Sequence, residues 1–334
     1  MLSSLLVSLA TAAEQHASLA ILVTSIAAST VVWMLLSGNS SFSFSSNKNG
    51  GGVFLDRERK SATLVGKESL SHDVCRFRFA LPNPRMVFGL PIGKHFKIWA
   101  PNAEGVKPGE WNGRADAEAD HDEVHRTYSP TSSNADVGHF EMVLKIYKGG
   151  VVDRFPDGGK VSQYLDSLPI GAKLDVAGPY GLVEYAGKGK FLIRRKERKV
   201  RRVGMIAGGT GLTPLLQIIK TALADPDDDI ELSLLFANQT EEDIFLRSEL
   251  EVLAQAHPNQ FKIWYTLDRP PKDGSWKFSS GFINEDMLKE HMPPPSTDDD
   301  STLILMCGPP PMIKFACRPN LDKLGYPKRD QVTF

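Results

Sequence analysis

The segment VGMIAGGTGLTP, residues 203–214, decides the fold of the C-terminal half of the chain. Its apolar start, VGMIA, has the length and composition of a buried strand. Three glycines follow within four residues, and an apolar-periodic stretch from Thr213 to about Ala224 then predicts a helix. Thr213 can cap that helix, and Pro214 suits its first turn. The segment is therefore typical of a strand, a tight turn and a helix.

The same alternation continues to the end of the chain. Three further buried strands are predicted at ELSLLF (231–236), FKIWYTL (261–267) and TLILMC (302–307). A second helix is expected from about Glu241 to His257, with Thr240 as its N-cap. Strands that alternate with helices predict a doubly wound, parallel sheet.

The region before it, from about residue 54 to 180, has a different pattern. Short β-type runs broken by Pro and Gly occur at VCRFRFAL (74–81), KHFKIWA (94–100), HRTYS (125–129), HFEMVLKIY (139–147) and AKLDVA (172–177). Their alternation predicts a small antiparallel barrel. One short helix is expected from Lys160 to Leu168. The stretch 101–122 is rich in acidic residues and poor in apolar ones, so we expect it to be an exposed loop.

The N-terminus predicts a membrane anchor. Residues 1–36 contain no Lys or Arg, and residues 19–36 form an uncharged run of 18 residues, close to the length that spans a bilayer core. A cleaved signal peptide is the alternative, although no basic side chain precedes the apolar run. The first basic residues, from Lys48 onward, lie downstream. The positive-inside bias then places the bulk of the protein on the cytoplasmic side.

Composition and length fit a globular protein of the α+β and α/β classes, with two domains and such an anchor. The 334 residues suggest two domains. We expect an anchor at 1–36, a tether rich in Ser, Asn and Gly at 37–52, a β-barrel domain at 53–185 and an α/β domain at 186–334. A net charge of −1 gives no general attraction to nucleic acid. Three cysteines, an odd number without paired spacing, argue against a disulfide framework or a cysteine-rich metal site and favour a reducing compartment.

Two loops at predicted strand ends carry candidate chemistry. The glycine turn GGTGLTP (208–214) opens a helix, so its free N–H groups can receive a pyrophosphate or another anion. Its spacing differs from G-x-G-x-x-G, and a turn without a ligand is the alternative. The loop CGPPPM (307–312) should border the same crevice, because ligands of such sheets bind at the carboxyl ends of strands. Its prolines suit a stiff wall beside a cofactor ring, with Cys307 as a neighbour; the alternative is a small buried apolar residue.

The barrel half carries two more candidate fragments. Arg126-Thr127-Tyr128-Ser129 ends a strand with a cation that can pair with phosphate and a ring that can lie along a flat cofactor. GGKVS (158–162) opens the short helix and offers backbone donors to a second phosphate. A structural ion pair for Arg126 and a solvated helix start for Lys160 are the alternatives.

Taken together and in this order, these fragments resemble the NADH-cytochrome b5 reductase family. The resemblance rests on RTYS (126–129), GGKVS (158–162), GPYG (178–181), GGTGLTP (208–214), LLFANQT (234–240), YTLDRPP (265–271) and CGPPPM (307–312), and it covers about residues 54–334. It implies an FAD domain followed by an NADH domain, in the ferredoxin-reductase-like superfamily. A membrane-tethering N-terminus fits its microsomal and mitochondrial outer-membrane members.

The resemblance also implies site residues. FAD and its phosphates would contact Arg126, Thr127, Tyr128, Ser129, Val143, Lys145, Lys148, Lys160, Val161, Ser162 and Thr213. The nicotinamide nucleotide crevice would comprise Gly208, Thr210, Gly211, Cys307, Gly308, Pro309 and Met312, with Lys145 nearby. The candidate catalytic residues are Lys145, Thr210 and Cys307. His95 matches a family histidine near the flavin, and a structural role is equally open for it.

Some positions depart from the family pattern. Many relatives carry Pro where this chain has Thr127, Met at Val161 and an aromatic residue at Lys148, so we expect altered affinity for FAD and not lost binding. The acidic stretch 101–122 has no counterpart that we can place. NADH is expected over NADPH, because LLFANQT lacks a basic residue for a 2′-phosphate and Asp268 would repel one near the adenosine.

The implied reaction transfers a hydride from NADH to FAD and single electrons onward to a haem protein, without a metal or a covalent nucleophile. The run 194–202 has seven basic residues in nine, which can steer acidic cytochrome b5, contact anionic lipid or form a solvated interdomain loop. We expect a monomer in the endoplasmic reticulum or mitochondrial outer membrane. The alternatives are a related flavin reductase of the nitrate reductase or desaturase type, and a non-enzymatic, membrane-tethered nucleotide-binding protein.

Overall fold

The computed structural model describes residues 51–296 and 302–334. The predicted anchor, 1–36, and nearly all of the predicted tether, 37–52, lie outside these residues. Within the described ranges, no helix combines the length and the apolar character needed to cross a membrane. The described residues form one compact unit.

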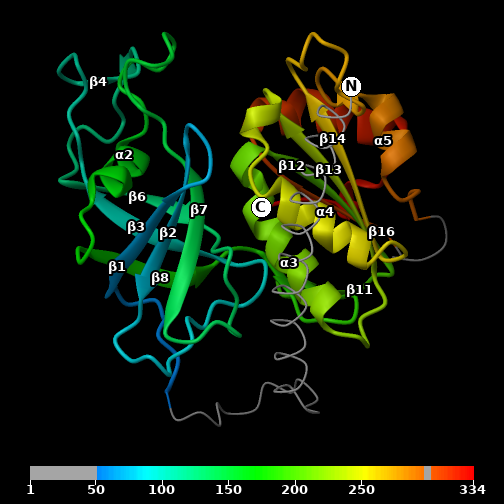
Figure 1. Cartoon of the computed structure of the whole chain (residues 1–334), viewed down its shortest axis with the longest axis horizontal. Coiled ribbons are helices and arrows are strands. Elements are labelled where there is room, and N and C mark those ends of the chain that lie inside the picture. Colours follow the sequence, from blue (N-terminus) through cyan, green and yellow to red (C-terminus); the bar gives the residue numbers. More distant parts are fainter. Residues whose placement is uncertain (1–50, 297–301) are drawn as a thin grey trace, which may run out of the picture. The chain divides into compact units, whose positions relative to one another are not determined.

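The first lobe is the predicted antiparallel barrel (Figure 1). Its strands follow the order β6-β3-β8-β1-β2-β7, and every neighbouring pair is antiparallel. The bounds are β1 Lys60–Ser69, β2 Val74–Ala80, β3 His95–Pro101, β6 Glu123–Tyr128, β7 His139–Lys145 and β8 Lys173–Tyr180. Alternate side chains point inward, as Phe96, Ile98 and Ala100 of β3 do. Phe79, Phe88 and Phe140 stack in the core, and helix α2 (Lys160–Ser167) adds Val161 and Leu165 to it.

The acidic stretch 101–122 is more ordered than the exposed loop expected from its composition. It contains a hairpin of β4 (Glu110–Trp111) and β5 (Arg114–Ala115). Asn112 and Gly113 connect these strands with φ values of 52° and 70°, and Asn-Gly is the pair that favours this left-handed turn. The stretch is mostly exposed, as expected, but it is not only a loop, because it contains this hairpin and its polar side chains find partners within the barrel lobe.

A three-stranded antiparallel sheet follows the barrel. It comprises β9 (Val183–Tyr185), β10 (Lys190–Ile193) and β11 (Lys196–Lys199). The basic run 194–202 begins at the tip of the β10–β11 hairpin, where Arg194 and Arg195 have positive φ. The side chains of both tip residues are exposed.

The second lobe is the predicted parallel sheet, in the order β15-β14-β13-β12-β16-β17. Its strands are β12 Arg202–Gly208, β13 Glu231–Asn238, β14 Phe261–Leu267, β15 Ser279–Ser280, β16 Thr302–Cys307 and β17 Gln331–Thr333. Helices α3 (Leu212–Ala224) and α4 (Arg247–Ala256) pack on one face through the largest apolar cluster. Helices α5 (Glu285–His291) and α6 (Arg318–Lys323) pack on the other. Helices therefore cover both faces of the sheet, which is doubly wound, as predicted.

Two local predictions in this lobe were wrong. The expected helix 241–257 is divided into the 3₁₀ turn η2 (Glu241–Asp243) and α4, because Leu246 adopts a left-handed conformation with φ 56°. Thr240 is the N-cap of η2, where its N–H and hydroxyl both donate to Asp243. Helix α3 begins at Leu212 with Gly211 as N-cap, so Thr213 lies inside the helix and donates to the carbonyl of Thr210 at 3.2 Å.

The two lobes contact each other directly. Val74 and Val143 of the barrel belong to the apolar cluster that packs α3 against the parallel sheet. The backbone N–H of Gly93 donates to the buried side chain of Gln217 in α3 at 3.2 Å. The carboxyl ends of the parallel strands therefore lie beside the Lys145 end of β7.

Candidate cofactor-binding site

The glycine turn approaches the loop after β16 as closely as backbones can. The turn is the 3₁₀ segment η1 (Gly209–Gly211), and a Cβ at Gly211 would lie only 2.1 Å from the carbonyl oxygen of Cys307. A Cβ at Gly208 would lie 2.8 Å from both Met312 and Pro309. The prediction that these two loops lie beside each other is therefore correct. Only glycine permits so close a contact.

One buried polar side chain at this edge was missed by the sequence analysis. Asn238 ends β13 and is 6% exposed, yet both its side-chain Oδ1 and Nδ2 lack a hydrogen-bond partner within the described residues. Burying an amide without partners costs about 1–3 kcal/mol, so this position fits a residue that binds a polar ligand. Its position in ANQT, directly after a buried strand, was the available signal.

Cys307 lies at the carboxyl end of β16, opposite Ala207 of β12. Burial raises the pKa of its thiol to about 11, so the thiol is protonated at neutral pH. A protonated thiol is a poor nucleophile. The side chain can therefore line the crevice, and the structure gives it no features of a covalent catalyst.

Lys145 connects the lobes through an ion-pair network. Its Nζ lies 2.5 Å from Asp73 in the barrel and 3.2 Å from Asp243 in η2. Burial lowers the pKa of Lys145, but hydrogen bonds and the charges of Asp73 and Asp243 outweigh it and raise that pKa above its usual value. His72 approaches both carboxylates, at 3.3 Å and 3.9 Å. The lysine ammonium occupies the space between Asp73 and Asp243, where a cation would otherwise bind.

The start of α2 offers donors to an anion. Gly159 is the N-cap, and Lys160, Val161 and Ser162 are buried. No protein acceptor within the described residues meets the backbone N–H groups of these three residues. Unpaired N–H groups at a helix start, together with the helix dipole, form an anion site. This arrangement fits a phosphate of FAD.

Arg126 and Lys160 meet at one carboxylate of the acidic stretch. Glu118 accepts two hydrogen bonds from the Arg126 guanidinium, at 2.7 Å and 2.8 Å, and lies 3.7 Å from Lys160 Nζ. Lys160, whose side chain is 1% exposed, also binds Asp116 at 2.6 Å. The alternative of a solvated Lys160 is therefore excluded, because its side chain is buried and already paired. Both cations therefore belong to one cluster, and the ion pair given as the alternative for Arg126 is present.

The remaining predicted residues occupy several environments. Tyr128 packs on the barrel core, and burial raises its pKa to about 12. Ser129 donates to the Lys94 carbonyl at 3.4 Å, and His95 stacks on Tyr180.

The other predicted residues differ in exposure. Thr127 is exposed on β6, Val143 is buried between the lobes and Thr213 is buried in α3. Asp268 is exposed after β14, and its N–H donates to the Asn238 carbonyl at 3.0 Å.

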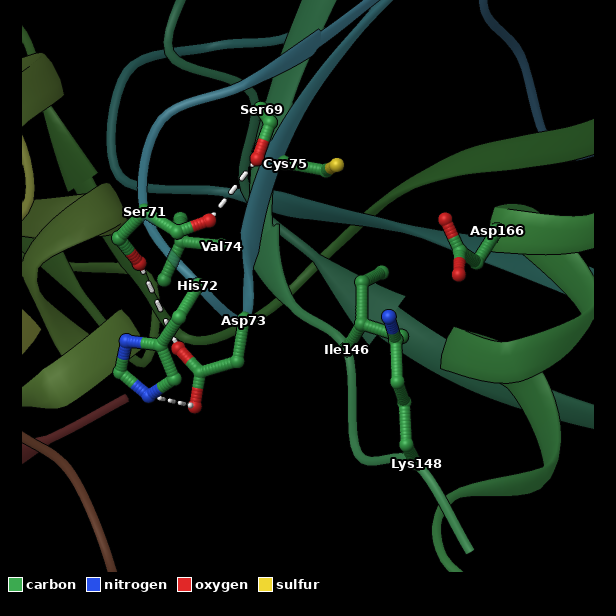
Figure 2. Close-up of a pocket in the computed structure, with 9 residues that line it drawn as sticks. All are labelled: Ser69, Ser71, His72, Asp73, Val74, Cys75, Ile146, Lys148 and Asp166. Atoms are coloured by element: carbon green, nitrogen blue, oxygen red, sulfur yellow. Dashed lines mark hydrogen bonds and ion pairs between the residues drawn. The ribbon is translucent and has the colours of Figure 1, made fainter.

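A small polar pocket lies below the β1–β2 hairpin (Figure 2). Its volume is about 200 Å³, and Lys148 is the one predicted site residue among those that line it. Sites that hold drug-sized ligands usually have about 300–1,000 Å³. The pocket is therefore too small for a dinucleotide. Figure 2 shows Lys148 next to Ile146, away from the His72–Asp73 pair.

Comparisons with known families match both lobes. The oxidoreductase FAD-binding domain matches residues 61–108 and 113–185, and the oxidoreductase NAD-binding domain matches residues 205–318. The predicted boundary at 185 and 186 stays a prediction.

Similar proteins include reductases from distant organisms. NADH-cytochrome b5 reductase 2 of Xenopus laevis is 50% identical over 277 residues, which cover 81% of this chain and 86% of that protein. NADH nitrate reductase of Solanum lycopersicum is 46% identical over 280 residues, but these cover only 28% of its length. A crystal structure of the cytochrome b5 reductase domain of Ulva prolifera nitrate reductase is 44% identical, with a TM-score of 0.75 over 84% of this chain and 99% of that one.

Proposed function

Because the chain belongs to the NADH-cytochrome b5 reductase family, we propose that it transfers electrons from NADH through FAD to cytochrome b5 or a similar acidic haem protein. The observation that carries the proposal is the meeting of three elements: the glycine turn, the loop after β16 and the Lys145 end of β7. These elements come from both domains that a flavin reductase requires. FAD, when bound, accepts a hydride and releases electrons singly, which NADH and haem cannot do with each other.

The residues of the barrel bind and orient FAD in this proposal. The backbone N–H groups of Lys160, Val161 and Ser162 hold a phosphate at the start of α2. The Arg126 guanidinium binds the phosphates through its planar fork. Tyr128, held by the barrel core, supplies a fixed surface for the ring system.

The parallel-sheet lobe binds and orients the nicotinamide nucleotide. Gly208 and Gly211 leave room for close backbone approach, and Asn238 supplies buried polar atoms to the ligand. Lys145, kept protonated by Asp73 and Asp243, stabilises negative charge at the junction of the lobes. Thr210 and Cys307 line the crevice.

We also propose NADH as the preferred donor. The segment 234–240 has no basic residue, and the exposed carboxylate of Asp268 lies next to the Asn238 end of β13. A 2′-phosphate would meet this negative charge without a cation from that segment.

The basic hairpin is the proposed docking surface for the acceptor. Arg194, Arg195, Lys196 and Lys199 expose positive charge on β10–β11 and its tip. Positive charge on one partner and negative charge on the other accelerate diffusional encounter and set orientation. Electron transfer to the acceptor should therefore slow as ionic strength rises.

The N-terminal segment supports a further part of the proposal. Its uncharged run of 18 residues and the downstream basic residues favour a single anchor in the endoplasmic reticulum or mitochondrial outer membrane, with the catalytic lobes on the cytoplasmic side. We propose a monomer.

The test uses the full chain purified in detergent. A flavin spectrum that is bleached anaerobically by NADH much faster than by NADPH, and restored by oxidised cytochrome b5, supports the proposal. A colourless protein that takes up no added FAD overturns it. Rapid bleaching without reoxidation by cytochrome b5 would instead favour another acceptor, as in the nitrate reductases that share 46% identity. Arg126→Gln should lower FAD affinity, which tests the phosphate ligand separately.

A further inference from the structure

Residues 102–118 of the acidic stretch fold over the start of α2, and we call this segment the acidic arm. Asp157 accepts hydrogen bonds from the N–H groups of Val106 at 2.6 Å and Asn112 at 2.5 Å. The Asn112 side chain accepts from the N–H groups of Asp157 and Gly158 and donates to the Gly158 carbonyl. The arm is therefore fixed directly beside the α2 N-cap.

A buried cation fixes the other end of the arm. Lys160 Nζ binds Asp116 and the side-chain oxygen of Asn102, both at 2.6 Å, and lies 4.9 Å from the centre of the Trp111 ring. Its side chain is 1% exposed and that of Asp116 is 10% exposed. Breaking such a pair leaves a buried charge without a partner. The Asp116–Lys160 contact is therefore a permanent anchor.

Glu118 contacts Arg126 in a different environment. The two side chains are 30% and 44% exposed, so solvent reaches this pair. Both terminal nitrogens of the guanidinium point at Glu118, and Nη1 also donates to the His125 carbonyl. A phosphate that accepts the same two hydrogen bonds would have to occupy the position of the Glu118 carboxylate, because two anions cannot both accept them.

We propose that Glu118 is a built-in competitor for the FAD phosphate at Arg126, held in place by the anchored arm. This inference rests on the proposed role of Arg126 as a phosphate ligand. Glu118 and phosphate exchange on the guanidinium, while Asp116 and Lys160 keep the arm beside the site. Removal of the Glu118 charge leaves Arg126 free for phosphate. The arm thereby weakens FAD binding and promotes the exchange of FAD.

The test compares FAD affinity and release in two variants of equal charge. FAD is titrated into the FAD-depleted full chain and its fluorescence is followed, and release is measured after dilution of the loaded protein. Glu118→Gln should tighten FAD binding by about two- to fivefold, the range expected for an accessible ion pair, and should slow release. Asp120→Asn is the matched control. Asp120 is exposed on the same acidic stretch, just beyond the arm, and has no ion pair within the described residues.

The outcomes separate the inference from the proposed function. FAD binding by Glu118→Gln that equals the Asp120→Asn control, or is weaker, overturns the competitor role. If Glu118→Gln folds poorly, Glu118→Asp replaces it, since the shorter side chain cannot span the same fork and should also tighten binding. Arg126→Gln with unchanged FAD affinity would refute the phosphate role of Arg126 itself, whatever Glu118 does. A gain in the Glu118 variant that disappears in the Arg126→Gln background supports the exchange on one guanidinium.

Discussion

The ion pair between Lys145 and Asp243 should measurably hold the two lobes together. Asp243→Asn removes the carboxylate charge but keeps an oxygen that can accept from Thr240. At 3.2 Å, the Coulomb energy of a unit pair is about 1.3 kcal/mol in water and about 5 kcal/mol at an effective dielectric constant of 20. Lys145 is 27% exposed and also paired with Asp73, so screening and sharing reduce the expected coupling to about 1 kcal/mol.

A double-mutant cycle isolates this coupling. Urea unfolding of the FAD-loaded full chain is measured for the unsubstituted protein, Lys145→Met, Asp243→Asn and the double variant. The coupling free energy between the two sites should be about 1 kcal/mol, because each single variant already abolishes the pair. A coupling below about 0.3 kcal/mol, the usual error of additivity, would refute the reasoning.

The pH dependence provides a second check on the same pair. Burial raises the pKa of Asp243, but hydrogen bonds from Thr240 and the Lys145 charge outweigh it and lower that pKa below its usual value. Its contribution is therefore complete above the unfolded-state pKa of about 4 and is lost as pH falls through the lower folded-state pKa. The stability difference between the unsubstituted protein and Asp243→Asn should be constant from pH 7 to 5 and shrink below about pH 4. A difference that grows on acidification would contradict this assignment.

Three further outcomes follow from the second lobe. Gly211→Ala should abolish NADH reduction of the flavin, because its Cβ would lie 2.1 Å from the Cys307 carbonyl oxygen. A Cβ at Gly209 would meet no atom within 4 Å, but the φ of Gly209 is 51°, so Gly209→Ala should cost only about 1 kcal/mol of stability. Asn238→Leu should stabilise the protein without NADH, by removing unpaired polar atoms, yet raise the KM for NADH about tenfold; equal KM values would refute its role in binding. Alkylation of Cys307 by iodoacetamide should be slow at pH 7 and accelerate about tenfold per pH unit up to the thiol pKa of about 11. NAD⁺ should slow the alkylation. A rate that reaches a plateau near pH 8 would contradict the burial of the thiol.

The parallel sheet was predictable because its signals are local. Residues 203–214 specify a buried strand, a glycine turn and a helix start within twelve positions, and each signal agrees with the tertiary fold. The break at Leu246 was not predictable from periodicity. Glu241 to His257 reads as one amphipathic helix, but the Thr240–Asp243 contacts end a first turn, and α4 restarts at Arg247. Tertiary contacts override helical propensity at such a position.

The surroundings of Lys145 show a second limit of sequence reasoning. Its partners Asp73 and Asp243 lie 72 and 98 positions away in the chain. Neither carboxylate has a neighbouring residue pattern that marks it as a partner of β7. Only the packing of the barrel on α3, through Val74 and Val143, brings them together. A charge network of this kind is a consequence of the fold and carries no local motif.

The acidic arm shows what composition alone does not predict about an electrostatic site. A stretch rich in Asp and Glu usually indicates a solvated loop, since isolated buried charges are costly. Here the cost is offset because Lys160, 44 positions from Asp116, is itself buried against Trp111 and needs an anion. GGKVS marks a helix start that attracts phosphate, and the same positive character attracts the carboxylates of the chain. A phosphate-binding motif therefore predicts where negative charge gathers, while only the structure shows that Glu118 of this chain pairs with Arg126.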